Sequence, residues 1–219
     1  MQRTTPYANG LTVTAHTGCM GTADNSLEAI CAGIENGANI VEFDLQFSAA
    51  GVPVLSHNTP TPEAVALDDA FALLAEYKNI QVNVDVKVCK KLDRVAALAE
   101  KYNMLDRIFF TGIFEKDTDA VKQMCPLVPY WLNVNVEKKN KQNEAYLSQL
   151  VQTVKNCGAV GINMNKKNAT KALVSAFHQN GLGVSLWTVN SFFDMIKAIA
   201  LKPDNITTRH PDTLIKKIR

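Results

Sequence analysis

The sequence lacks the features that mark disulfide-rich, membrane-spanning or exported proteins. Its five cysteines form an odd set without CxxC spacing or a paired pattern, so they are expected to be reduced thiols. No run approaches the roughly 20 apolar residues that a membrane helix needs, and no charged segment followed by an apolar one opens the chain. We therefore expect a cytoplasmic protein without a transmembrane segment.

The sequence also lacks a strong charge of either sign. Lys and Arg total 23 against 21 Asp and Glu, so the net charge is +2 and gives no electrostatic reason to expect nucleic acid as a partner. Basic stretches at 137–141 and 216–219 are interpreted as solvated loop and helix-end charges. No linker or low-complexity tract interrupts the chain, and 47% of its residues are hydrophobic, so one domain spanning 1–219 is expected.

Short β-rich segments alternate with helical patterns along nearly the whole chain, which is typical of a parallel sheet wrapped by helices. Eight such units favour a compact (β/α)8 barrel, with a doubly wound sheet as the alternative. The predicted strands are 11–15, 40–45, 80–87, 107–111, 129–135, 160–164, 183–188 and 205–208, with an extra β-like segment at 52–56. The predicted helices are 26–35, 68–77, 92–101, 116–124, 143–155, 169–179, 192–200 and 211–218.

Carboxylates stand at the ends of two predicted strands, where barrels of this kind carry their catalytic groups. Strand alternation places Glu42 and Asp44 on one face of the second strand, and Asp85 and Lys87 on one face of the third. Carboxylates that point into an apolar barrel must be paired or bind a cation, and this all-oxygen set suits Mg²⁺ or Ca²⁺. The alternative is that Lys87 neutralises a carboxylate, Asp85 in particular, without any metal.

Two of the four histidines follow apolar strand segments that end near these carboxylates. His16 follows the first strand and His57 the extra segment, whereas His178 lies within a predicted helix and His210 in a turn. Imidazole titrates near neutral pH, so two histidines beside an acidic cluster are suited to proton transfer. For the other two, a structural or solvent-exposed role is expected.

A phosphodiester substrate fits this set of groups. Its cleavage needs one group to deprotonate the nucleophile, another to protonate the leaving alcohol, and a cation to offset the developing phosphoryl charge. The two histidines and the carboxylate cluster are candidates for these three tasks.

Seven short segments of the chain, taken in order, resemble the motifs of the glycerophosphodiester phosphodiesterase family of PLC-like barrel enzymes. The family's motifs are His-Arg-Gly after a strand, Pro-Glu-Asn-Thr at a helix start, Glu-x-Asp or Glu-x-Glu, His-Asp, Glu-x-Lys, Trp-Thr-Val-Asn and Asp-Gly-Ile-x-Thr-Asp. Their counterparts here are residues 15–18, 23–26, 42–44, 57–58, 84–87, 184–190 and 203–208. The resemblance covers about 13 to 211, and its strength lies in the ordered spacing.

This resemblance implies a metal-dependent phosphoric diester hydrolase that acts on glycerophosphodiesters or lysophospholipids, with a role in lipid metabolism. It assigns general acid and base to His16 and His57, and Mg²⁺ or Ca²⁺ ligands to Glu42, Asp44 and Asp85. Lys87 would contact phosphate or hold the carboxylates in place, and Trp187 would line the substrate pocket. In the family, a neighbouring substrate hydroxyl attacks phosphorus to give a cyclic phosphate, which water opens in many members.

Three departures from the family pattern concern the substrate. Thr17, at a substrate-binding position, replaces the Arg that helps to hold phosphate, so binding should be weaker unless another cation fills that place. Asn58 replaces Asp and removes an anion. The segment between His57 and Asp85 is too short for a large cap, so the barrel mouth is expected to be open.

Two alternatives stay open at the level of sequence. The Asp-x-Lys form of the third strand also resembles sphingomyelinase D-type phospholipases, although the chain lacks their disulfide-stabilised, secreted character. The loss of Arg at Thr17 suggests a catalytically silent barrel that binds a phosphate-containing ligand, against which both histidines argue.

Overall fold

The computed structural model describes Tyr7 and residues 10–218. The ends of the expected 1–219 domain, at 1–6, 8, 9 and 219, lie outside the described residues. Among the described residues, no helix combines the length and the apolar character that spanning a membrane requires.

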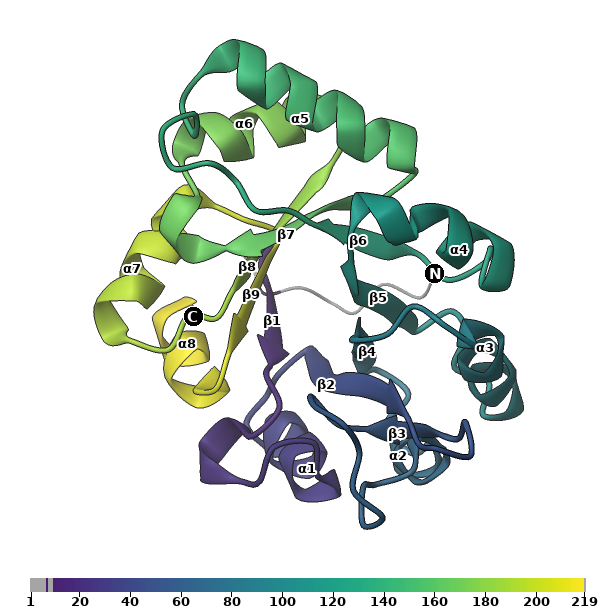
Figure 1. The fold of residues 1–219 in the computed structure, drawn as a ribbon. Coiled ribbons are helices and arrows are strands. Elements are labelled where there is room, and N and C mark those ends of the chain that lie inside the picture. The colour runs from purple at the N-terminus through teal and green to yellow at the C-terminus, as the bar shows by residue number, and fades with distance from the viewer. Residues whose placement is uncertain (1–6, 8–9, 219) are drawn as a thin grey trace.

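Within the described residues, eight parallel strands form a closed barrel (Figure 1). Each strand pairs with the next, and β1 pairs with both β2 and β9, which closes the sheet and leaves no open edge in the ring. The predicted (β/α)8 barrel is confirmed, and the alternative doubly wound sheet is wrong because such a sheet stays open. The barrel strands are β1 (Thr12–Ala15), β2 (Ile40–Phe47), β4 (Gln81–Val86), β5 (Ile108–Ile113), β6 (Tyr130–Asn133), β7 (Gly161–Asn165), β8 (Gly183–Trp187) and β9 (Asn205–Thr208).

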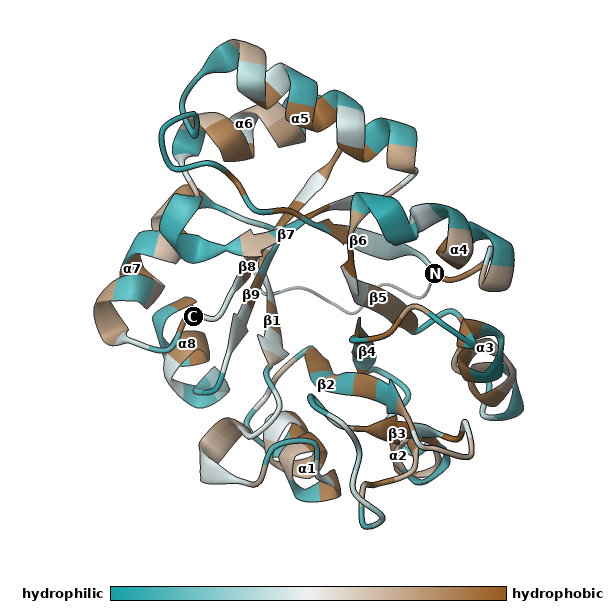
Figure 2. Cartoon of the chain, in the orientation of Figure 1, coloured by the Kyte–Doolittle hydropathy of each residue, from teal (hydrophilic) through white to brown (hydrophobic). Residues whose placement is uncertain are grey.

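Helices surround the barrel and bury their apolar sides against it. In α5 the buried positions include Leu147, Leu150, Val151 and Val154, at the three- and four-residue spacing of a helix face. Figure 2 shows the resulting mixture of hydrophilic and hydrophobic residues along this helix. The α-helices of the described residues are α1 (Leu27–Glu35), α2 (Leu67–Leu74), α3 (Leu92–Lys101), α4 (Thr118–Met124), α5 (Glu144–Cys157), α6 (Lys171–Gln179), α7 (Phe192–Leu201) and α8 (Pro211–Ile218).

A ninth strand in the described part of the chain, β3 (Pro53–Leu55), lies outside the parallel ring. It forms a hairpin with β2, antiparallel to it, with Leu45 opposite Leu55. The backbone N–H of Ser56 continues this pairing by donating to the carbonyl of Asp44 at 2.9 Å. The extra segment predicted at 52–56 is therefore an added strand, and it brings His57 back to the end of β2. A short connection then leads to α2, and no large insertion in the described part of the chain covers the barrel.

The inner surface of the barrel is lined largely by polar side chains. Residues in register share a face, and β2 aligns Glu42 with Asn83 and Asp44 with Asp85 of β4. Side chains on this face hydrogen-bond to one another across strands, as between the Thr111 hydroxyl and the Asn83 carbonyl oxygen at 2.8 Å. Other buried polar residues of the strands include Thr14, Asn163, Ser185, Asn205 and Thr207. Paired polar groups of this kind remove much of the cost of placing carboxylates nearby.

Candidate active site

A cavity of about 830 Å³ lies where the barrel strands end at their C-terminal side. The structure brings all eight predicted site residues to its lining: His16, Thr17, Glu42, Asp44, His57, Asp85, Lys87 and Trp187. His178 lies elsewhere, on α6, where its Nε2 is 2.8 Å from a carboxylate oxygen of Asp204. His210 is exposed.

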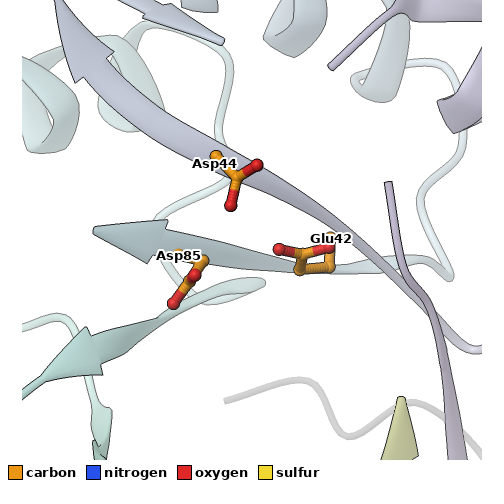
Figure 3. Close-up of side chains that lie close together, drawn as sticks. All are labelled: Glu42, Asp44 and Asp85. Atoms are coloured by element: carbon orange, nitrogen blue, oxygen red, sulfur yellow. The ribbon is translucent and has the colours of Figure 1, made fainter. Parts of the chain in front are cut away.

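Three carboxylates meet at one point of the cavity. Glu42, Asp44 and Asp85 each offer an oxygen atom within 4.8 Å of the others. Figure 3 shows them turned toward a common space, with two carried by β2 and one by β4. Such an all-oxygen set at short mutual distances fits a hard divalent cation such as Mg²⁺ or Ca²⁺ and does not resemble a structural zinc site.

Burial makes this cluster electrostatically demanding. Glu42 is 6% exposed, and its burial, followed by the charges of Asp44 and Asp85, raises its pKa well above the ordinary value. The backbone N–H of Thr17 donates to a Glu42 carboxylate oxygen at 2.9 Å and partly offsets this effect. A cation among the three carboxylates would favour their charged forms.

Lys87 lies against two of the three carboxylates. Its Nζ is 2.8 Å from Asp44 and 2.5 Å from Asp85. Burial disfavours the charged amine, but the charges and hydrogen bonds of Asp85 and Asp44 outweigh it and raise the pKa of Lys87. Of the two roles expected for Lys87, this geometry corresponds to holding the carboxylates in place.

Asn25 fixes the orientation of Asp44, a contact that the sequence alone did not reveal. Its side-chain N–H donates to the Asp44 carboxylate, and its side-chain oxygen accepts from the Asp44 backbone N–H, both at 2.9 Å. Asn25 has a φ of 58°, a left-handed conformation that Asn tolerates better than most residues. The sequence signal for this role of Asn25 was the asparagine of the motif at 23–26. The following residue, Ser26, caps α1, and its side chain accepts a hydrogen bond from the Ala29 N–H.

Asp85 is held from the neighbouring strand. The Thr111 hydroxyl lies 2.8 Å from its carboxylate oxygen. Gly112 follows with a φ of 75°, and a Cβ at this position would lie 2.3 Å from the Val86 carbonyl oxygen and 2.8 Å from the Asp85 carboxylate. Only glycine gives β5 room to pass so close to this ligand candidate.

The two cavity histidines both direct Nδ1 toward a neighbouring acceptor. His16 Nδ1 is 2.8 Å from the Thr17 carbonyl oxygen, and His57 Nδ1 is 3.1 Å from the side-chain oxygen of Asn58. Both oxygens accept, so the tautomer with its proton on Nδ1 matches these two contacts and leaves Nε2 to exchange protons. The Nε–H of Arg209, 3.4 Å from His16 Nδ1, matches the other tautomer of His16. Burial, followed by the charge of Arg209 among the lowering effects, places the pKa of His16 below 6.5.

Thr17 is only 3% exposed, and its polar groups serve the framework of the site. Its N–H holds Glu42, and its hydroxyl accepts from the backbone N–H of Asn25. Trp187 lines the cavity as expected, and within the described residues its buried Nε1 has no hydrogen-bond partner.

Arg209 is a cavity residue that the sequence motifs did not bring out. It follows β9, and its side chain reaches His16 and Asp24, with Nε 3.4 Å from His16 Nδ1 and Nη2 2.8 Å from the Asp24 carboxylate. The available signal was its position directly after the last strand motif, at a strand end of the barrel.

Comparison with known proteins connects this site with a family. The model of the glycerophosphoryl diester phosphodiesterase family matches residues 14–76 and 64–213. A search of curated protein sequences found no match.

Solved structures with the same fold carry related names. A glycerophosphodiester phosphodiesterase from Thermotoga maritima is 21% identical, with 95% of this chain and 98% of that chain covered and a TM-score of 0.69. One from Parabacteroides distasonis is 17% identical, with 98% of both chains covered and a TM-score of 0.78. A phosphodiesterase from Oleispira antarctica, solved with the product sn-glycerol-3-phosphate, is 18% identical, with 94% and 96% covered and a TM-score of 0.79.

Proposed function

The chain belongs to the glycerophosphoryl diester phosphodiesterase family and is a phosphoric diester hydrolase, and we propose that it cleaves glycerophosphodiesters by histidine acid/base catalysis with a divalent cation. The observation that carries this proposal is the convergence of three carboxylates and two histidines on one cavity at the barrel mouth. The product named for the Oleispira antarctica phosphodiesterase supports a glycerol phosphate product here.

Glu42, Asp44 and Asp85 would hold the cation, with Mg²⁺ or Ca²⁺ as the ions that their oxygens suit. When bound, it would supply positive charge to the phosphoryl oxygens as negative charge develops there. Lys87 and Asn25 keep Asp44 and Asp85 in position for this task, as outer partners of metal ligands do.

His16 is the candidate base of the first step. Its lowered pKa keeps the ring neutral near pH 7, and its Nε2 accepts the proton from the glycerol hydroxyl next to the phosphate. That oxygen forms a bond to phosphorus, and the bond from phosphorus to the leaving alcohol breaks. His57, protonated on both ring nitrogens at the start of the step, gives its Nε2 proton to the departing oxygen, so a cyclic phosphate and a free alcohol result.

The second step returns both histidines to their starting states. His57 accepts a proton from a water molecule, whose oxygen attacks the phosphorus of the cyclic phosphate. His16 returns its proton to the glycerol oxygen as the ring opens, and glycerol phosphate is the product. Asn58 orients His57 through a neutral amide, where the family pattern has a carboxylate.

Two other readings of this site have less support. A sphingomyelinase D-like phospholipase shares the acidic cluster and the histidines, but the family match over residues 14–213 favours glycerophosphodiesters. A silent phosphate-binding barrel would not need two histidines beside a carboxylate cluster in one cavity.

A substrate panel of glycerophosphodiesters and lysophospholipids, assayed with Mg²⁺, Ca²⁺ and EDTA, tests the proposal. We expect turnover of a glycerophosphodiester that EDTA abolishes and added metal restores. Asp85→Asn should remove most of this activity, whereas Asp68→Asn, which changes a carboxylate on the outer helix α2, should leave it intact. Full activity in excess EDTA would refute the role of the cation, and the absence of turnover on the whole panel would refute the proposed reaction.

A further inference from the structure

We propose that Arg209 binds the phosphate of the substrate and takes the place of the arginine that the chain lacks at position 17. This inference rests on the proposed function, because it names the group that would hold the phosphodiester in the same cavity.

Two positions differ in charge from the family motifs. Thr17 stands where His-Arg-Gly has its arginine. When Asp-Gly-Ile-x-Thr-Asp is aligned on the identical residues Asp204, Ile206 and Thr208, its last position falls on Arg209, one residue beyond the segment 203–208, so an arginine stands where the motif has an acid. The chain thus keeps a positively charged arginine in these motifs, but after β9 and not after β1.

The fold places these two positions side by side. Strands β1 and β9 are neighbours, with Ala15 in register with Thr208. The pairing continues beyond the strands, since the His16 N–H donates to the Thr208 carbonyl at 2.9 Å. A side chain at 209 therefore enters the cavity beside the position that a side chain at 17 would occupy, and Arg209 lines it.

The guanidinium of Arg209 is oriented on one side and has donors to spare. Asp24 accepts from Nη2 at 2.8 Å, and Asp24 itself packs over Gly18, where a Cβ would lie 2.0 Å from its carboxylate oxygen. Among the described residues, the side-chain hydrogen bonds of Arg209 use Nε and Nη2, so Nη1 has no partner, and the side chain is 40% exposed. A guanidinium fixed by one carboxylate still presents N–H groups in a plane that suits phosphate oxygens.

The other cations of the cavity are less suited to this task. Lys87 is engaged by Asp44 and Asp85 at 2.8 and 2.5 Å. Lys116 is exposed on the connection after β5, whereas Arg209 adjoins the acid/base candidate His16. A phosphate held by Arg209 would therefore lie next to the group that exchanges protons with the substrate.

Three variants test the inference: Arg209→Gln, Arg209→Lys and the control Lys101→Gln. The control removes one positive charge from an exposed ion pair of similar length, 2.7 Å to Asp68, on the outer helices. The readouts are the KM for a glycerophosphodiester and the inhibition constant of inorganic phosphate, both at fixed divalent cation concentration. Arg209→Gln should raise both about tenfold to a hundredfold, because a charge-assisted contact to the phosphate is lost. Arg209→Lys should give a smaller increase, and the control should give none.

The possible outcomes separate this inference from the proposed function. An active wild type whose KM and phosphate inhibition are unchanged by Arg209→Gln would overturn the role of Arg209 alone. A wild type without turnover would overturn both. If Arg209→Gln does not fold, the folded Arg209→Lys variant is measured instead. An inhibition constant of phosphate unchanged from wild type in that variant would contradict the binding of phosphate by the planar guanidinium of Arg209.

Discussion

Asn25 and Asp44 exchange two hydrogen bonds of 2.9 Å, so a loop residue after β1 fixes a carboxylate on β2. Replacing Asn25 with Gly keeps the left-handed backbone available and removes only the side chain. We expect divalent cation affinity to fall about tenfold to a hundredfold, as for outer partners of metal ligands. Isothermal titration with Mg²⁺ or Ca²⁺ measures this change.

The neighbouring cap provides the matched control for this loop. Ser26→Ala removes the N-cap of α1 and should cost about 1 kcal/mol of stability without reducing cation affinity. Equal cation affinities for wild type and Asn25→Gly would show that Asp44 does not need this partner.

Gly112→Ala should damage both stability and the site. The new Cβ would lie 2.3 Å from a backbone carbonyl of β4 and 2.8 Å from the Asp85 carboxylate, and neither can yield without moving the strand. Gly181→Ala is the control, because Gly181 also has a positive φ, 70°, but nothing lies within 4 Å of the added Cβ.

The control variant should lose about 1–2 kcal/mol from backbone strain alone. Gly112→Ala should lose more than this, and its activity should also fall. Urea denaturation followed by an activity assay at saturating cation distinguishes the two. Identical stability losses in both variants would contradict the close approach of β5 to Asp85.

His16→Ala and His57→Ala should each reduce the rate of turnover by about 10² to 10⁴ while the fold is retained. Because both act in one proton-transfer cycle, the double variant should lose less than the product of the two single losses. His178→Ala, which removes an exposed contact between α6 and Asp204, should keep wild-type kcat. Near-wild-type turnover by the double variant would exclude the pair from catalysis.

The cysteines should differ widely in reactivity toward iodoacetamide. Burial raises the pKa of Cys19 to about 11 and that of Cys125 to about 12, so at pH 8 less than about 1% of either thiol is ionised. Cys31 is half-buried and should be alkylated first. Cys89 should follow, because burial raises the pKa of its thiol. Peptide mapping by mass spectrometry gives the order, and urea-unfolded protein is the control in which all five should react. Rapid native labelling of Cys125 would contradict its burial.

Much of the fold was predictable because its signals are local. Alternating β-rich and helical segments predicted the eight barrel units, and the bounds of α3, α8 and β9 agree with those predicted. Two-residue alternation correctly placed Glu42 with Asp44 on one face. The closure of the sheet was inferred from the number of units, since no local pattern encodes the pairing of β1 with β9.

The sequence by itself determined which chemical groups stand at the strand ends, since strand periodicity and motif order depend on neighbours along the chain. Only the tertiary structure decided how those groups meet. Lys87 bridges two carboxylates, Asn25 clamps Asp44, and Arg209 reaches His16 from a residue 193 positions away. The physical reason is that a hydrogen bond or an ion pair forms over about 3 Å, whereas the partners are joined only by strand register and barrel closure, which many distant contacts fix together.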